Sequence, residues 1–257
     1  LVGGFLGAGK TSILYKAGEI LTKCGEKVGL ITNDQATNLV DTVFLSGHEM
    51  AVTEVSGSCF CCNFPGFIKA VEEIAEATDN GIIIAEPVGS CTDLSATIMQ
   101  PVKDKYNSWV VPSPMTVVAD PERLRGILDK VPSKAAYITE KQFDEADIIL
   151  INKIDVLDDK YAEELIARTK ERWPKAKVMS VSAKEGTGVE AWLEEVLSGG
   201  SAGSNLATVD YDVYADGEAA YGWLNATYSF EKTDTDLGKD AGELLEILDS
   251  EFSKAGV

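Results

Sequence analysis

Apolar and polar positions along the first 197 residues follow two alternating patterns. Short continuous apolar runs are typical of strands buried in a parallel sheet, and they predict strands over residues 1–4, 28–32, 82–86, 116–120, 148–152 and 178–181. Between them, apolar residues recur at helical spacing, and we expect helices to begin near Lys10, Gly66, Thr92, Pro121, Asp159 and Val189. This alternation predicts an α/β fold with a mostly parallel sheet flanked by helices.

The pattern changes after residue 197. Residues 198–205 are rich in Gly and Ser, as in a flexible linker. Beyond them, residues 208–214 and 221–230 alternate in strand fashion, and residues 237–252 have helical spacing. We therefore expect a large domain over 1–197, a linker over 198–205, and a small α+β segment over 206–257 that is too small to be stable alone. We expect residues to be missing at both ends, because residue 1 falls inside the first expected strand and residue 257 comes just after the last expected helix.

Composition limits the classes of function. The 257 residues are 45% hydrophobic and carry a net charge of −19, which argues against binding to nucleic acid or to an anionic membrane. The longest apolar run is well short of the ~18 residues of a membrane span. Three of the five cysteines fall within four positions, which is unlike a disulfide framework, and we expect a reducing cytoplasmic location.

Residues 4–11 read Gly-Phe-Leu-Gly-Ala-Gly-Lys-Thr and lie between an expected strand and an expected helix. This is the pattern of a phosphate-binding loop, in which glycines let backbone N–H groups face the phosphates and the helix adds the positive end of its dipole. We expect Lys10 to neutralise the β- and γ-phosphates and Thr11 to bind Mg²⁺. The expected nucleotide contacts here are Gly7, Ala8, Gly9, Lys10, Thr11 and Ser12.

A second motif, Asn-Lys-x-Asp, follows the apolar run at 148–151 and predicts that the nucleotide is GTP. Asp155 can accept hydrogen bonds from the guanine N1–H and 2-amino group, while Lys153 lies along the base. Adenine lacks both donors, and a buried carboxylate left without them costs ~3–5 kcal/mol. After the strand at 178–181, the N–H of Ala183 could reach guanine O6. The expected base contacts are Asn152, Lys153, Asp155, Ser182, Ala183 and Lys184.

Two further carboxylates follow expected strands beside the phosphate loop. Glu86 ends the strand at 82–86, where a P-loop enzyme holds Mg²⁺ through an acidic side chain. Asp34 follows the strand at 28–32 and could orient the attacking water or contact Mg²⁺. Gly89 completes a Glu-x-x-Gly step that lets the backbone approach the γ-phosphate. The expected catalytic residues are Lys10, Asp34 and Glu86, and the expected Mg²⁺ ligands are Thr11, Asp34 and Glu86.

Cys59, Cys61 and Cys62 lie within four residues, between the second and third expected strands. Three thiols on one turn can converge on a soft ion, with Zn²⁺ or Co²⁺ expected first. Zn²⁺ usually takes four ligands, and the fourth could be water, Cys91, or a thiol or carboxylate of a second subunit. A redox pair and simple packing of cysteines remain alternatives.

These motifs, in this order, resemble the CobW-type GTPases, which are related to the HypB and UreG proteins of hydrogenase and urease maturation. The resemblance covers residues 1–197, although this chain has Asn33-Asp34 where the family usually has Asn-Glu. It implies a metallochaperone whose nucleotide state controls metal transfer to a client metalloenzyme or a corrinoid system. It also implies a homodimer with GTP near the subunit interface, and slow hydrolysis of GTP to GDP without a partner.

Two rival functions stay open. The first is a GTP-dependent switch or cofactor-loading chaperone that uses no metal and whose cysteines sense redox state or only pack. The second is a P-loop kinase of small molecules, against which the Asn-Lys-x-Asp motif counts, because this motif selects guanine.

Overall fold

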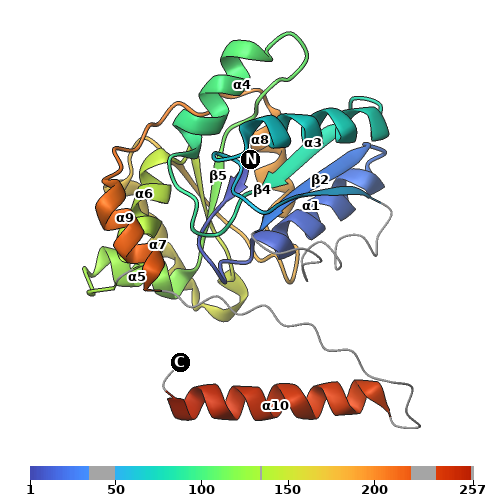
Figure 1. Ribbon diagram of the computed structural model, residues 1–257. Helices are drawn as coiled ribbons and strands as arrows, with labels where there is room; N and C mark the ends of the chain where they lie inside the picture. Colours follow the sequence, from blue (N-terminus) through green and yellow to red (C-terminus); the bar gives the residue numbers. More distant parts are fainter. Residues whose placement is uncertain (35–49, 134, 221–235, 256–257) are drawn as a thin grey trace. The chain divides into compact units, whose positions relative to one another are not determined.

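The computed structural model describes residues 1–34, 50–133, 135–220 and 236–255, with Asp34 and Leu237 described by their backbone only. All strand pairs in this part of the chain are parallel. One sheet has the order β1-β5-β6-β7, built from β1 (Val2–Gly3), β5 (Thr116–Ala119), β6 (Ile148–Ile151) and β7 (Lys177–Ser180). The other has the order β3-β2-β4, built from β3 (Ala51–Ser56), β2 (Val28–Asp34) and β4 (Ile82–Glu86). Because β1 contacts β4, the two sheets lie side by side (Figure 1).

Helices cover both faces of these sheets, as the alternation of strand and helix patterns predicts. On one face, α1 (Lys10–Lys23) and α8 (Val189–Leu197) pack against strand residues such as Ile148 and Leu150. The intervening residues Ile149 and Ile151 belong to the core of the other face. That face carries α3 (Phe64–Ala77), a π-helix (Ser95–Met99) continued by α4 (Gln100–Lys105), α5 (Pro121–Leu128), α6 (Ala136–Glu145) and α7 (Asp159–Arg172). The central strand β6 is apolar throughout because both of its faces are buried.

The structure corrects several expected elements. Strand β3 was not expected, because its Thr53 and Glu54 interrupt the apolar pattern at an edge of the sheet. Helix α6 was also not expected, and the helix expected near Thr92 begins at Ser95 as a π-helix. The helix at Pro121 is confirmed, with Asp120 as its N-cap.

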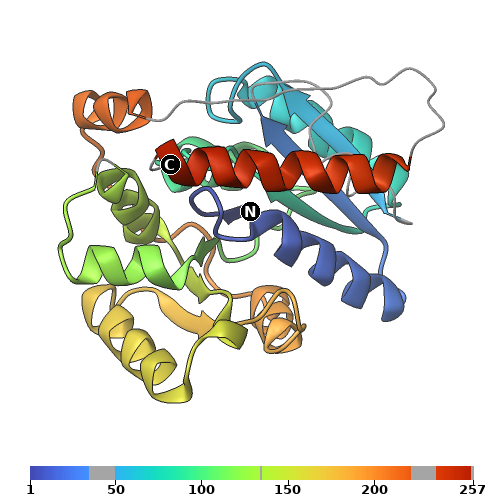
Figure 2. The same ribbon diagram turned by 90° about the horizontal axis from the view of Figure 1, so that it is seen from below.

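The expected strand over 208–214 is wrong. Residues from Tyr211 onward form a helix, α9 (Tyr211–Ala219), whose first turn is capped when Asp210 accepts hydrogen bonds from the N–H groups of Asp212 (3.0 Å) and Val213 (3.3 Å). Figure 2 shows α9, in orange, beside α6, which it contacts. The expected strand over 221–230 lies outside the described residues, and the helix expected over 237–252 is confirmed as α10 (Leu237–Ala255).

The Gly- and Ser-rich segment after α8 packs on the core instead of forming a free linker. Lys103 Nζ donates to the Ala202 carbonyl at 2.7 Å, and Asp147 accepts from the N–H groups of Gly203 (2.5 Å) and Ser204 (2.9 Å). The described contacts form two compact units, Leu1–Gly222 and Trp223–Val257. The boundaries expected after residue 197 and before residue 206, between a large domain, a linker and a small segment, stay a prediction. Within the described ranges, we find no helix that is long and apolar enough to cross a membrane.

Glu145, at the end of α6, is fully buried. Its Oε2 accepts a hydrogen bond from the Ser95 N–H at 2.8 Å, while Oε1 has no partner in the described part of the chain. Burial raises the pKa of Glu145 from about 4.5 to about 8, and the Ser95 amide offsets only part of this effect. The side chain is therefore protonated at neutral pH.

This raised pKa predicts a stability that falls as the pH rises. Between about pH 5 and 8 the native protein keeps a proton that the unfolded chain releases, so its free energy of unfolding decreases through this range. Glu145→Gln cannot ionise, and we expect it to be more stable than wild type at pH 8, by on the order of 1–4 kcal/mol. Urea unfolding at pH 5.5 and pH 8 measures this difference.

The matched control is Glu163→Gln, an exposed residue of α7, which should unfold as wild type does at both values of pH. Equal pH dependence in wild type and Glu145→Gln would contradict the assignment of this proton to Glu145.

Candidate functional site

The loop between β1 and α1 has the form of a phosphate cradle. Gly7 and Gly9 have φ values of 74° and 92°, a region that side chains other than glycine rarely adopt. A Cβ on Gly9 would stand 2.4 Å from Asn152 Nδ2, so only glycine fits there. Helix α1 has no side-chain cap and no acidic residue in its first turn, and its N-terminus suits an anion.

Lys10, Thr11 and Glu86 come together beside this cradle. The Thr11 hydroxyl donates to both carboxylate oxygens of Glu86 at 3.2 Å, and Lys10 Nζ lies 3.7 Å from Glu86 Oε1. Lys10 and Glu86 are only 7% and 6% exposed. The hydroxyl and the carboxylate that the sequence predicts as Mg²⁺ ligands are thus direct neighbours, and this oxygen donor set suits the ion.

Asp34 and Ser12 are the other two residues expected near the phosphates. In the sheet, Thr32 pairs with Glu86, so the backbone of Asp34 lies two residues further toward the carboxyl end of β2. The side chain of Asp34 is outside the described residues. Ser12, in the first turn of α1, is exposed.

Asn152 connects the phosphate loop to the two loops expected to bind the base. Its Nδ2 donates to the Ala8 carbonyl at 3.0 Å, and its Oδ1 accepts from the Ala183 N–H at 2.9 Å. The side chain is 2% exposed. The Ala183 N–H, which we expected to reach guanine O6, is therefore used to hold the loops together in this structure.

Asp155 and Ser182 form the rim of the expected base site. Ser182 Oγ donates to Asp155 Oδ1 at 2.6 Å, and this hydrogen bond lowers the pKa of Asp155. Lys153 has a left-handed backbone (φ 60°), and its Nζ lies 2.8 Å from Asp120 Oδ2. Lys184 is exposed and pairs with the neighbouring glutamate. The Asp155 carboxylate is therefore ionised, as an acceptor of hydrogen bonds from guanine must be.

The loop that follows Glu86, the last residue of β4, is held in place by a buried side chain that the sequence did not indicate. Gln142 on α6 donates from Nε2 to the carbonyls of Gly89 (3.0 Å) and Cys91 (2.9 Å). A Cβ on Gly89 would come within 3.0 Å of the Leu6 side chain, so this loop packs closely against the phosphate loop. No local sequence signal marks Gln142, because its partners lie about 50 residues away.

The thiols of Cys59, Cys61 and Cys62 converge on one turn. All three sulfur atoms lie within 4.8 Å of one another, and Cys59 Sγ is 2.9 Å from Cys61 Sγ. A Zn–S bond of about 2.3 Å places the sulfur ligands of a tetrahedral ion about 3.8 Å apart, so a small outward movement would let these thiols hold a soft metal ion.

Asn33, at the carboxyl end of β2, holds this turn. Its Nδ2 donates to the carbonyls of Val55 (2.7 Å) and Ser58 (2.8 Å), and its Oδ1 accepts from the Phe60 N–H at 3.0 Å. Phe60 is fully buried and packs against Phe67 of α3, with the two ring planes tilted by 43°. Because Phe60 anchors the turn in the core, Cys59 and Cys61 on either side of it are half-buried. Asn33 could have been recognised from the sequence, because it is a polar residue at the end of an apolar strand.

Hydrogen bonds among the three thiols shift their pKa values in different directions. The neighbouring Cys61 lowers the pKa of Cys59, whereas Cys59 raises the pKa of Cys61 to about 12 and also raises that of Cys62. Cys59 is thus the first of the three to ionise. A thiolate is the form of cysteine that binds metal ions.

Helix α9 also reaches the loop after β4. Ser90 Oγ donates to Glu218 Oε1 at 2.7 Å, and the Tyr214 hydroxyl donates to the Ser90 carbonyl at 3.3 Å. Tyr211 donates to Asp93 at 2.8 Å. The segment after residue 206 therefore takes part in the site's surroundings, a role for which the sequence had no motif.

Comparisons with known proteins agree with this geometry. A model of the CobW/HypB/UreG nucleotide-binding domain matches residues 1–180. The fold is similar to that of HypB from Helicobacter pylori in complex with nickel, with 16% identity over 78% of this chain and 87% of that one and a TM-score of 0.56. It is also similar to the hydrogenase maturation factor HypB from Archaeoglobus fulgidus, with 17% identity over 75% and 85% of the two chains and a TM-score of 0.52.

The structural similarities show a shared fold, and the match of the family model covers well over half of the chain. Together with the phosphate cradle and the cysteine turn, it establishes that the chain belongs to the CobW/HypB/UreG family of P-loop GTPases.

Proposed function

We propose that this protein binds and hydrolyses GTP and uses its nucleotide state to control the delivery of a transition metal to a client. The observation that carries the proposal is the position of the cysteine turn, which contains Cys59, Cys61 and Cys62. Asn33 ties this turn to β2, and β2 pairs directly with β4, the strand that ends in Glu86 beside Thr11. The metal-binding turn and the Mg²⁺ ligands are thus attached to adjacent strands.

Nucleotide binding rests on the cradle from Gly7 to Ser12 and on the Asn152–Asp155 and Ser182–Lys184 loops. Lys10 would neutralise charge on the β- and γ-phosphates, and Asp155 would accept from the guanine N1–H and 2-amino group. Bound Mg²⁺, held by Thr11, Glu86 and Asp34, would supply further charge neutralisation at the phosphates. Asp34 would orient the attacking water.

The metal would be Zn²⁺ or Co²⁺, held by Cys59, Cys61 and Cys62, because soft thiolates favour these ions. The client would be a metalloenzyme or a corrinoid system, reached in the cytoplasm by a homodimer. The net charge of −19 argues against nucleic acid or an anionic membrane as the partner.

One observation supports a second candidate, a GTP switch without metal. The 2.9 Å approach of the Cys59 and Cys61 sulfur atoms and the lowered pKa of Cys59 also suit a redox-sensing thiol pair. Metal binding by the reduced protein separates the two candidates.

GTP should bind at least tenfold more tightly than ATP, a difference of ~1.4 kcal/mol, because only guanine offers donors to Asp155. Asp155→Asn should reverse the hydrogen-bonding pattern, weakening GTP and favouring xanthine nucleotides. Calorimetric titration with GTP, ATP and XTP measures all three affinities.

The control is Asp158→Asn, three residues further on, which caps α7 and should keep the wild-type preference because Asn is an equally good cap. Equal affinities of the intact protein for ATP and GTP would refute the guanine site.

Metal and nucleotide affinities should be coupled. Binding of a non-hydrolysable GTP analogue in place of GDP should change the Zn²⁺ or Co²⁺ affinity by ~1–3 kcal/mol, since both ligands act on adjacent strands. The triple variant Cys59→Ser/Cys61→Ser/Cys62→Ser should lose tight metal binding and keep GTP binding. Competition titrations with a chromogenic chelator measure both effects.

Cys24→Ser, which changes an exposed cysteine just after α1, serves as the matched control. Identical metal affinity in the triple variant and in wild type would rule out the metallochaperone function and favour the metal-free switch.

A further inference from the structure

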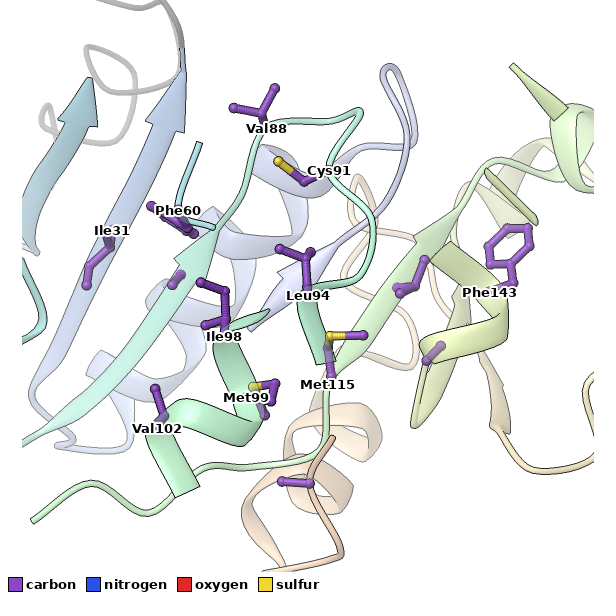
Figure 3. Packing of buried hydrophobic residues seen from close by; sticks show 14 of the residues in the cluster. Ile31, Phe60, Val88, Cys91, Leu94, Ile98, Met99, Val102, Met115 and Phe143 are labelled. Atoms are coloured by element: carbon purple, nitrogen blue, oxygen red, sulfur yellow. The ribbon is translucent and has the colours of Figure 1, made fainter. Parts of the chain in front are cut away.

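A fourth cysteine reaches the cysteine turn from a different part of the chain. Cys91 lies on the loop after β4, in the buried apolar cluster against which Cys59 and Cys61 pack, and these two thiols raise the pKa of Cys91. Figure 3 shows Cys91 with its sulfur turned toward the side on which Phe60 lies, and Phe60 separates Cys59 from Cys61 in the chain.

Two hydrogen bonds hold the backbone of Cys91. Its N–H donates to the Val88 carbonyl at 2.9 Å, which closes a turn, and its carbonyl accepts from the buried Gln142 amide at 2.9 Å. The opposing cysteine turn is held by Asn33 on β2. Two loops with independent anchors therefore bring Cys91 and the cysteine turn together in one cluster, an arrangement that packing alone does not require.

The four thiols differ in exposure in an ordered way. Cys62 is exposed, Cys59 and Cys61 are intermediate, and Cys91 is only 5% exposed. Helix α9 contacts the residue next to Cys91 through the hydrogen bond between Ser90 and Glu218. An ion can thus enter at Cys62 and lose its water at the buried end.

We propose that Cys91 is the fourth ligand of the transition metal, so that the site has four thiolates from two loops. This inference rests on the proposed metal binding at Cys59, Cys61 and Cys62. Four cysteines are a common ligand set for tetrahedral Zn²⁺, and each thiol that binds releases its proton to solvent. Among the fourth ligands that the sequence leaves open, Cys91 is the one that the protein itself supplies.

This ligand gives the metal a direct path to the nucleotide. Cys91 is the fifth residue after Glu86, whose carboxylate accepts hydrogen bonds from Thr11. Metal bound by Cys91 restrains the loop between these residues, and a change in the ligands of Mg²⁺ at Glu86 alters the position of Cys91. The coupling between metal and GTP then depends on Cys91.

Cobalt(II) titration of the reduced full chain tests the proposal. Sulfur-to-cobalt charge transfer reports thiolate ligands, and tetrahedral sulfur coordination is diagnostic of such a site. Cys91→Ala should lose about a quarter of the charge-transfer intensity expected of four thiolates, bind Co²⁺ at least tenfold more weakly, and lose the difference in affinity between GDP and the GTP analogue. Cys24→Ser should match wild type in all three.

The outcomes are distinguishable. If Cys91→Ala keeps the wild-type intensity and affinity, then Cys91 only packs, and the three-thiol site stands without it. If reduced wild type shows no cobalt–thiolate absorption, the proposed metal function fails and this inference fails with it.

A measurement on wild type does not depend on how Cys91→Ala folds. X-ray absorption at the zinc edge of the reduced protein should give four sulfur neighbours. Three sulfur atoms and one oxygen or nitrogen would overturn the proposal. Unchanged GTP affinity of Cys91→Ala shows that the variant is folded.

Discussion

The site depends on the pair of hydrogen bonds made by the Asn152 side chain. One amide group satisfies the Ala8 carbonyl of the phosphate loop and the Ala183 N–H of the loop after β7. Because Asn152 is buried, neither backbone group has water as an alternative, and loss of the side chain would leave both unsatisfied at a cost of ~1–3 kcal/mol each. A single side chain therefore joins the phosphate loop to the loop after β7.

The same arrangement recurs at the other sheet. Asn33 joins β2 to the cysteine turn, and Gln142 joins α6 to the loop after β4. In all three places a buried amide side chain holds a loop at the carboxyl edge of a parallel sheet; Asn152 and Asn33 both donate and accept, whereas Gln142 donates to two carbonyls. Parallel sheets present their loops at this edge, so the elements that bind ligands need such internal supports.

The acidic residue Glu86 links the two halves of the site. Its strand pairs with β2, which carries Asn33, and its carboxylate contacts Thr11 and Lys10. The loop that continues from Glu86 contacts Gln142 and, through Ser90, helix α9. A change at the phosphates thus has a short covalent path to Cys91, and hydrogen bonds connect the same loop to α9 in the C-terminal part of the first compact unit.

The amino-acid sequence by itself determined the parallel α/β fold, the phosphate loop, the Asn-Lys-x-Asp motif and the cysteine turn, because each depends on residues that are neighbours in the chain. Apolar runs identified β2, β4, β5 and β6 within a residue or two, whereas the edge strand β3 was missed because Thr53 and Glu54 break its pattern. Local alternation also suggested a strand over 208–214, but Asp210 caps a helix there that packs on α6. Only the tertiary structure decided that Asn152 is a brace between loops, that Gln142 holds the loop after β4, and that the Cys91 thiol reaches those of Cys59 and Cys61. These contacts join residues that are some 30 to 140 positions apart, and the local periodicity of a sequence carries no information about which distant side chains the folded sheet brings together.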